Sequence, residues 1–361
     1  KDTHNRILQL GDCIKETMKL KSEGLKISVM IPTYNMANTI QETLKSVLNQ
    51  TYNNFEIIIQ DNNSQDNTYK IIKSFSDSRI KYFKNDINIG YARNLIAGKK
   101  NCQGDILYFL GADDILSNNA LLDTSNAFMV DNEVGAVTRP YFWFQDDINI
   151  PIRVTPHVFN TEDEIIYIKD NKKAIHAMHN EILGQMSGLA FRIKYLKDSF
   201  FNTENDWIAH GYPFMHIFKK YPIVFLKNYQ VAVRIGSNVI RQKGTTAYAV
   251  SPTKRWIDML DEVLYEKKFQ AFKNYFIKKI IASNYLGLVQ IKNYSCLKFL
   301  LREIYYMVKY NLQNLFNVNF WFFSLGCILI PSSLLIKLVD FYKNKIYSKT
   351  VSKIQFEYRI S

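Results

Sequence analysis

Short apolar runs alternate with amphipathic stretches through the first 110 residues of the chain. Residues 26–31 and 55–60 are rich in Ile and Val and end in polar residues, which is typical of strands buried on both faces. Between them, apolar residues recur at helical spacing, so residues 38–48 are predicted to form a helix with Asn38 as its N-cap. These three segments make a βαβ unit.

The same alternation continues as helix, strand, helix and strand, at about residues 66–75, 79–83, 91–100 and 105–110. Strands and helices that alternate in this way form a mostly parallel sheet with helices on both faces. Ligands bind beyond the carboxyl ends of the strands in such sheets, so a site is expected just after each strand. Three polar clusters stand there, at residues 32–35, 61–66 and 111–114.

The composition predicts a folded chain with an anionic partner. Its 361 residues are enough for a catalytic domain plus an appendage, and 47% apolar with 22% charged residues allows a full core. The net charge is +13, which fits nucleotide phosphates, nucleic acid or an acidic membrane surface. Residues 254–361 hold 17 Lys or Arg against 7 Asp or Glu, so a net +10 of this charge belongs to the last third.

The last third also holds the longest uncharged run, residues 310–336. Pro331 interrupts the run, which makes it marginal as a membrane-spanning helix. A pair of interfacial helices at anionic head groups is favoured, and the alternative is an apolar helical hairpin packed on the rest of the protein. The lysines expected near the head groups are Lys309, Lys337, Lys343, Lys345 and Lys349.

The cysteines and the start of the chain favour a reducing compartment. The four cysteines lie far apart without a C-x-x-C pair, which suggests neither a disulfide framework nor a zinc knuckle. No signal peptide is expected, because residues 1–26 mix charges of both signs and lack an apolar segment.

The polar clusters after the strands can hold a nucleotide without the usual glycine-rich loops. No G-x-G-x-x-G follows the first strand and no P-loop motif occurs. Asp113 and Asp114 can present oxygens to a divalent cation and a diphosphate, or they form a turn that caps the next helix. Asp61 can accept from a base N–H or start a turn. Arg93 can reach a phosphate or lie solvated on the surface.

Taken in order, residues 27–35, 60–66, 88–94 and 104–114 resemble the nucleotide-sugar half of family 2 glycosyltransferases, which have a GT-A fold. The resemblance covers about residues 26–115. The resemblance implies nucleoside contacts for the first cluster, Pro32, Thr33, Tyr34 and Asn35. It implies a base contact for Asp61, a nucleotide contact for Arg93 and a metal contact for Asp113.

The chain departs from the family's pattern at two places. The usual D-x-D-D is here Gly111-Ala-Asp-Asp114, so the first carboxylate is absent while the second is kept as Asp113. Family members commonly have Asp and Gly where this chain has Asn62 and Asn63.

Three segments of the second half also resemble parts of these enzymes. Residues 203–208 resemble the E-D element, which implies Asp206 as the general base that deprotonates the acceptor, with Glu204 in reserve. From the residues alone, Asp206 is equally a carboxylate favoured at a helix N-terminus. Residues 184–192 resemble the acceptor-side strand. Residues 231–238 resemble a strand whose Arg234 helps to hold the diphosphate.

His176 and His179 are spaced i, i+3, as metal ligands on one helix face can be. No third ligand is placed near them, so a surface position is favoured.

The expected protein is therefore an α/β enzyme of GT-A type, with a mostly parallel sheet flanked by helices. Its expected parts are an N-terminal extension (residues 1–25), a nucleotide-sugar half (residues 26–115), an acceptor half (residues 116–253) and a basic, aromatic, membrane-associating helical region (residues 254–361). The leading hypothesis is an inverting glycosyltransferase that uses Mn²⁺ or Mg²⁺ and a UDP-sugar, in cell-surface polysaccharide synthesis. Its expected acceptor is a glycan or lipid-linked glycan.

The expected location is the cytoplasm, peripheral or monotopic at the inner face of the cell membrane. An alternative hypothesis is a catalytically inactive nucleotide-sugar-binding or scaffold protein, prompted by the missing first aspartate. A nucleic-acid binder is suggested by charge alone and disfavoured by the lack of a recognition motif.

Overall fold

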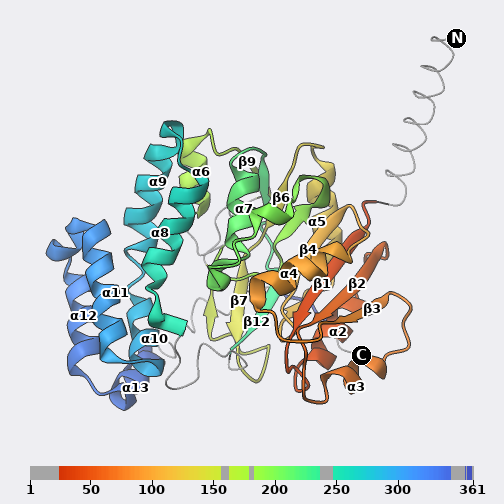
Figure 1. Ribbon diagram of the computed structural model, residues 1–361, viewed down its shortest axis with the longest axis horizontal. Helices are drawn as coiled ribbons and strands as arrows, with labels where there is room; N and C mark the ends of the chain where they lie inside the picture. The colour runs from red at the N-terminus through yellow and green to blue at the C-terminus, as the bar shows by residue number, and fades with distance from the viewer. Residues whose placement is uncertain are drawn as a thin grey trace, which may run out of the picture.

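The computed structural model describes residues 24–155, 162–178, 183–235, 247–342, 354 and 356–359. Nearly all of the predicted N-terminal extension lies outside these ranges. Figure 1 shows a half built around sheets, which carries α2 to α5, and a stack of helices from α8 to α13 beside it.

The main sheet is built on β1 (Ile27–Thr33), which lies between β2 (Phe55–Asp61) and β4 (Ile106–Phe109). β3 (Ile80–Lys84) adds to β2, and these four strands are all parallel, as predicted. The apolar residues of β1, β2 and β4 are buried because helices cover both faces of a parallel sheet, while β3 at the edge is only partly buried. The register pairs Ile27 with Phe55 and Thr33 with Asp61, so the first two polar clusters meet at one edge.

The sheet becomes mixed beyond β4. Its order is β3-β2-β1-β4-β10-β6-β11-β9, with β10 antiparallel to both of its neighbours. The added strands are β10 (Ala190–Arg192), β6 (Ala136–Thr138), β11 (Ile223–Phe225) and β9 (Glu164–Ile166). The predicted acceptor-side strand is thus present as β10, paired directly with β4.

A second, smaller sheet has the order β5-β12-β7-β8. Its strands are β5 (Ile115–Leu116), β12 (Val231–Arg234), β7 (Tyr141–Phe144) and β8 (Arg153–Val154). Side chains alternate between its two faces. One face packs into the core under the main sheet and the other forms a separate apolar cluster.

Helices α2 (Ile40–Leu48), α3 (Thr68–Lys73), α4 (Tyr91–Lys100) and α5 (Ala120–Met129) occupy the connections of the first half. The first three confirm the predicted helices, while the prediction of Asn38 as an N-cap is wrong. Helix α2 begins one residue later, after Thr39, and a backbone turn replaces the side-chain cap, because Met36 O accepts from the N–H groups of Thr39 and Ile40.

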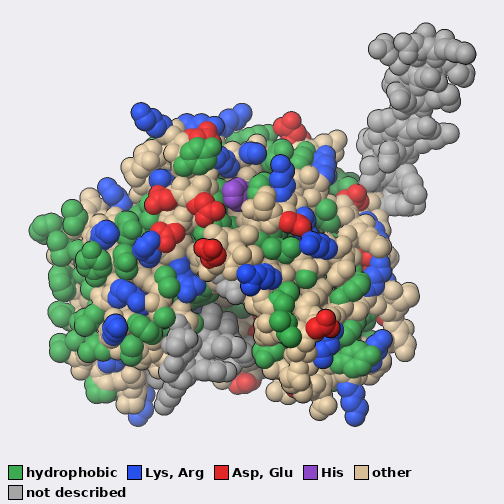
Figure 2. Space-filling view, viewed as in Figure 1, with side chains coloured by type: hydrophobic (Ala, Val, Ile, Leu, Met, Phe, Trp, Pro, Cys, Tyr) green, Lys and Arg blue, Asp and Glu red, His purple; other side chains and the backbone are tan. Residues whose placement is uncertain are grey.

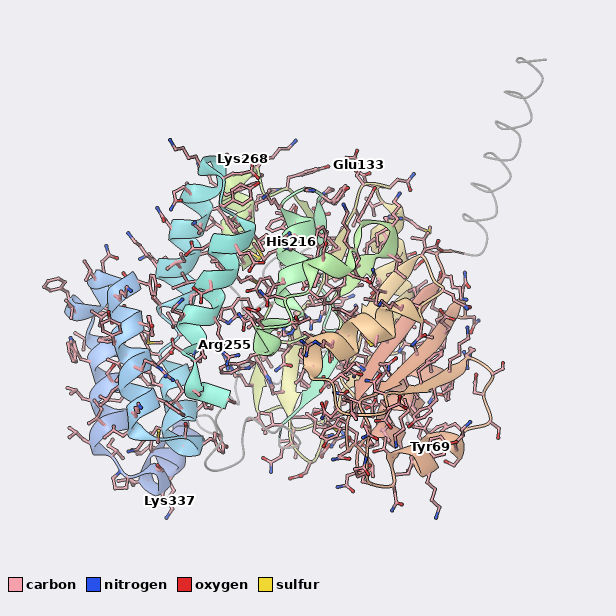
Figure 3. All side chains as sticks on the ribbon, viewed as in Figure 1. Tyr69, Glu133, His216, Arg255, Lys268 and Lys337 are labelled. Atoms are coloured by element: carbon pink, nitrogen blue, oxygen red, sulfur yellow. The ribbon has the colours of Figure 1, made fainter. Side chains whose placement is uncertain are left out.

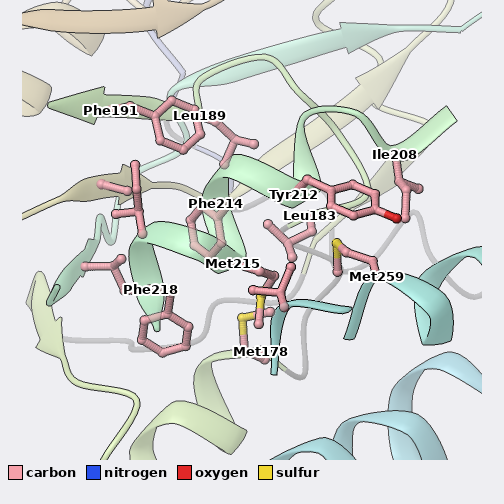
Figure 4. Packing of buried hydrophobic residues seen from close by; sticks show 14 of the residues in the cluster. Met178, Leu183, Leu189, Phe191, Ile208, Tyr212, Phe214, Met215, Phe218 and Met259 are labelled. Carbon is pink, nitrogen blue, oxygen red and sulfur yellow. The ribbon is translucent and has the colours of Figure 1, made fainter. Parts of the chain in front are cut away.

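The later helices form two groups. Helices α6 (Asn171–Met178), α7 (Gly211–Phe218), α8 (Pro252–Val263) and α9 (Gln270–Phe276) share one core with the main sheet. Phe214 and Phe218 of α7 belong to the same cluster as Met259 of α8 (Figure 4). Each such side chain contributes about 1.5–3 kcal/mol on burial, so α8 and α9 are part of the sheet half energetically. The predicted boundary at residue 253 falls inside α8.

The second group is α10 (Leu286–Tyr294), α11 (Leu297–Tyr310), α12 (Val318–Leu329) and α13 (Ser332–Tyr342), which share a smaller cluster of their own. Pro331 separates α12 from α13, so the long uncharged run is two short helices. Among the described residues, every helix is too short or too polar to cross a membrane.

Candidate functional site

The loops after β1 and β2 are joined into one unit. Asn35 adopts a left-handed conformation with φ 55°, which asparagine tolerates better than most residues. Its backbone N–H donates to Ser64 Oγ at 2.8 Å, and its side-chain oxygen accepts from the Gln65 N–H at 2.8 Å. Tyr34 precedes it and remains 39% exposed. The predicted nucleoside contacts of residues 32–35 therefore lie on a loop whose backbone is fixed.

Asp61 is fully buried and anchors the turn after β2. Its Oδ1 accepts from the backbone N–H and the hydroxyl of Ser64 at 2.8 and 2.7 Å, and its Oδ2 accepts from the Tyr82 hydroxyl at 2.5 Å. Burial, then the bond to Asp61, raises the pKa of Tyr82, which keeps that hydroxyl a donor. A carboxylate offers about four acceptor positions, and these bonds use three of them. The base contact of Asp61 stays a prediction.

Asn62 connects this turn to the loop before α4. Its amide group donates to Asn88 Oδ1 at 2.8 Å and to Gly90 O at 3.3 Å. Its oxygen accepts from the Ile89 N–H at 2.9 Å and from Asn85 Nδ2 at 3.0 Å. Both donors and both acceptor positions are used, so the Asn that departs from the family's pattern holds the two loops together.

Arg93 lies on the first turn of α4, and its phosphate contact stays a prediction. Its side chain is exposed, and within the part of the chain that the structure describes it makes no hydrogen bond or ion pair. Its guanidinium is therefore not committed to another described group.

The acidic turn after β4 is fixed through Asp114. Ser187 Oγ accepts from the Gly111 N–H at 2.7 Å and donates to Asp114 Oδ2. The Arg234 backbone N–H donates to Asp114 Oδ1 at 2.9 Å. Asp114 is 3% exposed, while Asp113 beside it is only partly buried. A strand, β5, follows this turn, so the alternative in which these aspartates cap a helix does not apply.

Close packing explains the glycine at the start of this turn. A Cβ on Gly111 would lie 2.8 Å from Asp114 Oδ2, 3.0 Å from Asp113 Oδ1 and 3.1 Å from Ser187 Oγ. A third carboxylate here would add both crowding and negative charge to two carboxylates already side by side. Burial, reinforced by the charge of Asp113, raises the pKa of Asp114 above its ordinary value, while the bonds from Ser187 and Arg234 oppose that rise.

Arg234 holds the acidic turn rather than reaching beyond it. Its Nε donates to Asp113 O at 3.2 Å, its Nη1 donates to Gln145 O at 3.3 Å, and Nη2 pairs with Glu42 of α2. The guanidinium also stacks on Phe144 at 4.5 Å. Each of the three guanidinium nitrogens thus has a partner within the protein, and the diphosphate contact expected for Arg234 stays a prediction.

The acidic turn fits a cation that is shared with a diphosphate. Among the described residues, no three His, Cys, Asp or Glu side chains are grouped to hold a metal by themselves. Mg²⁺ in phosphate-transfer sites commonly takes one or two carboxylates and completes its shell with phosphate oxygens and water. Asp113 meets that requirement. His176 lies exposed on α6, and His179 is outside the described residues.

The predicted base lies on a loop that rests on α8. Asp206 begins a 3₁₀ turn, Asp206–Ile208, which packs against α4. Ahead of it, Asn205 Nδ2 donates to Arg255 O at 3.3 Å, and the Arg255 guanidinium lies 5.3 Å from the Trp207 ring. Figure 3 shows Arg255 where α8 meets the sheet half. The 3₁₀ turn that begins at Asp206 thus contacts the helix that carries Arg93.

A buried histidine, His210, joins the two halves of the site. Its Nε2 lies 3.0 Å from Leu183 O and its Nδ1 lies 3.4 Å from the hydroxyl of Tyr91, the first residue of α4. Leu183 O can only accept, so Nε2 carries the proton of the neutral ring. Burial lowers the pKa of His210 to about 4, which keeps it neutral near pH 7. No motif in the sequence indicated this residue.

The comparison with sequences matches part of the chain to one family. Residues 28–200 match the family model described as glycosyl transferase family 2. Over 115 residues the chain is 37% identical to the UDP-Glc:alpha-D-GlcNAc-diphosphoundecaprenol beta-1,3-glucosyltransferase WfgD of Escherichia coli, covering 32% of this chain and 45% of that protein. Over 99 residues it is 36% identical to the GalNAc(5)-diNAcBac-PP-undecaprenol beta-1,3-glucosyltransferase of Campylobacter jejuni, covering 27% and 32%. The match spans less than half of the length of either relative.

Solved structures confirm the fold. S. aureus TarS in complex with UDP-GlcNAc superposes with a TM-score of 0.59 at 17% identity, covering 80% of this chain and 81% of that chain. The mannosyltransferase PcManGT from Pyrobaculum calidifontis, in complex with GDP-Man and Mn²⁺, gives 0.51 at 14% identity, covering 85% and 86%. The expected GT-A architecture is confirmed.

Acidification is expected to destabilise the fold through His210. The unfolded chain binds a proton near the ordinary histidine pKa of about 6.5, whereas the folded chain resists protonation down to about 4. The stability gained from the neutral ring is present above pH 6.5 and lost as the pH falls through this window, by up to roughly 2–3 kcal/mol. Urea unfolding at pH 7 and pH 4.5 measures the loss, which His210→Gln should reduce.

The exposed His176→Gln variant is the control and should follow the parent protein at both pH values. Equal pH dependence in the parent and in His210→Gln would contradict the assignment.

Proposed function

The protein carries a domain of glycosyl transferase family 2, and we propose that it transfers a sugar, with inversion, from a nucleoside diphosphate to a lipid-linked glycan. A UDP-sugar is the proposed donor. The observation that carries the proposal is the acidic turn at the carboxyl end of β4, where a buried Asp114 fixes a more accessible Asp113. Such a turn suits a group that carries two phosphates and a cation.

The names of the similar proteins support the choice of donor and acceptor. WfgD is named as using UDP-Glc and a diphosphoundecaprenol-linked sugar, and the Campylobacter jejuni enzyme is named for an undecaprenol-linked glycan. TarS was solved with UDP-GlcNAc and with UDP. A bacterial lipid-linked acceptor of cell-surface polysaccharide is therefore proposed for this chain as well.

In this proposal Asp113 would hold Mn²⁺ or Mg²⁺ together with the donor diphosphate. A cation bound there would offset the negative charge that grows on the leaving diphosphate. Asp114, Ser187 and the Arg234 backbone keep the Asp113 main chain in place, so the carboxylate is aligned before the donor arrives. Arg93 at the start of α4 is the proposed phosphate contact, and the loop of residues 32–35 with Asp61 is the proposed nucleoside site.

Asp206 is proposed as the general base. It removes the proton from the acceptor hydroxyl while that oxygen bonds to the anomeric carbon and the bond to the diphosphate breaks. The loop that carries it is held by Asn202, whose Oδ1 accepts from the N–H groups of Glu204 and Asn205 at 2.9 and 3.0 Å. Glu204, exposed on the same loop, is the second candidate for this role.

A nucleotide-sugar-binding protein without turnover is the second candidate function. The observation that favours it is Gly111 in place of the family's first carboxylate. The close contacts of Gly111 with both following carboxylates weaken it, because they make the glycine a packing requirement of an ordered turn.

An anionic membrane surface is the proposed partner of the helices α11 to α13. Exposed apolar side chains gather at their outer edge (Figure 2), the most exposed being Phe316, Val318, Phe322 and Leu329 at 90%, 82%, 74% and 74%. The lysines Lys298, Lys309 and Lys337 are exposed around them, while Glu303 is buried. Basic charge around a protruding apolar edge suits peripheral or monotopic attachment at the inner face of the membrane.

Substitution of the two aspartates is expected to separate donor binding from chemistry. Asp113→Asn should weaken Mn²⁺-dependent binding of UDP-sugars, and Asp206→Asn should keep binding and lose about 10²–10⁴-fold in turnover. Release of UDP from a panel of UDP-sugars, with a lipid-linked acceptor, measures both. Asp258→Asn, which removes only a surface ion pair with Lys254, is the matched control.

Two results would count against the proposed reaction. Full turnover in Asp113→Asn would contradict the proposal that this turn holds the metal. Donor binding without turnover in the parent protein, across all donors and acceptors tried, would instead support the second candidate function.

Membrane attachment is expected to depend on the exposed apolar edge. Replacement of Phe316, Val318 and Phe322 by Ser should abolish flotation with vesicles of anionic phospholipid, because apolar insertion and charge are both needed for stable attachment. The same substitutions at the less exposed Leu325, Leu334 and Leu338 should reduce flotation less. Equal flotation of the parent and the first variant would refute this surface.

A further inference from the structure

A segment near the C-terminus lies on the nucleotide half of the protein. The backbone N–H of Asn118 donates to Glu357 O at 2.8 Å, and Asn49 Nδ2 donates to Arg359 O at 2.9 Å. Asn49 ends α2 and Asn118 lies two residues beyond β5, whereas α12 and α13 lie at the opposite side of the molecule (Figure 1). We call Ile354 together with residues 356–359 the C-terminal strap.

Buried and exposed side chains alternate along the strap, as in an extended chain that lies on an apolar surface. Phe356 and Tyr358 are partly buried, while Glu357 and Arg359 between and after them are exposed. Phe356 packs edge-on against Phe142 with ring centroids 5.0 Å apart. Period-two burial with a backbone hydrogen bond beside an edge strand is how an added strand binds a sheet.

The surface under the strap is the outer face of the small sheet. Ile115 of β5, Ala232 of β12 and Phe142 of β7 belong to the cluster that Ile354, Phe356 and Tyr358 cover. Ile115 and Ala232 are direct cross-strand partners. An uncovered edge strand with an apolar face is unfavourable in water, so the strap removes an exposure that β5 would otherwise have.

The same two strands hold the acidic turn. β5 starts immediately after Asp114, so any shift of Ile115 moves the turn directly. β12 ends at Arg234, which bonds to Asp114 through its backbone and to Asp113 O through Nε. The strap therefore supports, from behind, both strands that position the two aspartates.

We propose that the C-terminal strap is a positioning element for the Asp113–Asp114 turn, so that binding of a nucleoside diphosphate depends on Phe356 and Tyr358, which lie on the far face of the small sheet. This inference rests on the proposed function of that turn. The strap touches neither donor nor cation; it acts through Ile115, Ala232 and Asn118.

The test uses the full chain with Phe356→Ala and Tyr358→Ala combined. Mn²⁺-dependent binding of UDP, measured by calorimetry, should weaken by about tenfold or more, since small displacements of a binding group are costly. Hydrogen exchange of the amides of residues 113–118 should become faster. Phe356→Tyr with Tyr358→Phe keeps the aromatic cover and should restore both. Phe299→Ala, a partly buried aromatic of the α10–α13 cluster, is the matched control and should leave both unchanged.

The outcomes distinguish a failure of the strap proposal from a failure of the proposed function of the turn. Unchanged UDP affinity in the strap variant would overturn the proposal, and so would an equal loss in Phe299→Ala, because it would reflect general destabilisation. If the parent protein fails to bind UDP with Mn²⁺, the proposed donor is wrong, and the exchange of residues 113–118 alone decides on the strap. Unchanged exchange there would overturn it.

Discussion

The hydrogen bonding of the Asp114 carboxylate is the constraint on which the site depends. A buried carboxylate costs several kcal/mol unless its oxygens are bonded, and here Ser187 and the Arg234 backbone supply those bonds. The two partners come from the segment before β10 and from the end of β12, so both sheets must be correctly assembled before the buried carboxyl group has its hydrogen bonds. In return, Ser187 and Arg234 hold the turn that carries Asp113. Gly111 lies in the same packing, because a Cβ there would lie 2.8 Å from Asp114 Oδ2, 3.0 Å from Asp113 Oδ1 and 3.1 Å from Ser187 Oγ.

The C-terminal third of the chain divides into three parts with different structural roles. Helices α8 and α9 belong to the core of the sheet half, and α8 carries Arg255, against which the loop of Asp206 rests. Helices α10 to α13 have their own cluster and present the exposed apolar edge. The strap then lies on the small sheet. The net charge of +10 in this third is spread over it, with +3 in residues 254–281, +3 in residues 282–342 and +4 in residues 343–361.

The local pattern of apolar and polar residues was enough to predict β1 to β4, α2 to α4 and the sheet edge where the polar clusters meet. The spacing of apolar residues and the residue types of turns are both local properties of the sequence. It missed Ser187, which lies 73 residues from Asp114, and the occupation of the Arg234 guanidinium by Glu42, 192 residues away. Such contacts leave no periodic signal. His210 was missed for the same reason. The strap does have a periodic signal in the sequence. Its apolar residues alternate at Ile354, Phe356 and Tyr358, a strand-like pattern in a region that is expected to be helical.

The role of the buried carboxylate is tested most directly at its hydroxyl partner. Ser187→Ala removes one donor from Asp114 without touching Asp113, the proposed cation ligand. Calorimetric titration of UDP, with and without Mn²⁺, on the parent and on this variant measures what the bond contributes to the site. If the turn is positioned through Asp114, the Mn²⁺-dependent affinity should fall roughly tenfold, which corresponds to the loss of one buried hydrogen bond. Unchanged Mn²⁺-dependent affinity for UDP in Ser187→Ala would contradict the claim that Asp114 positions the turn.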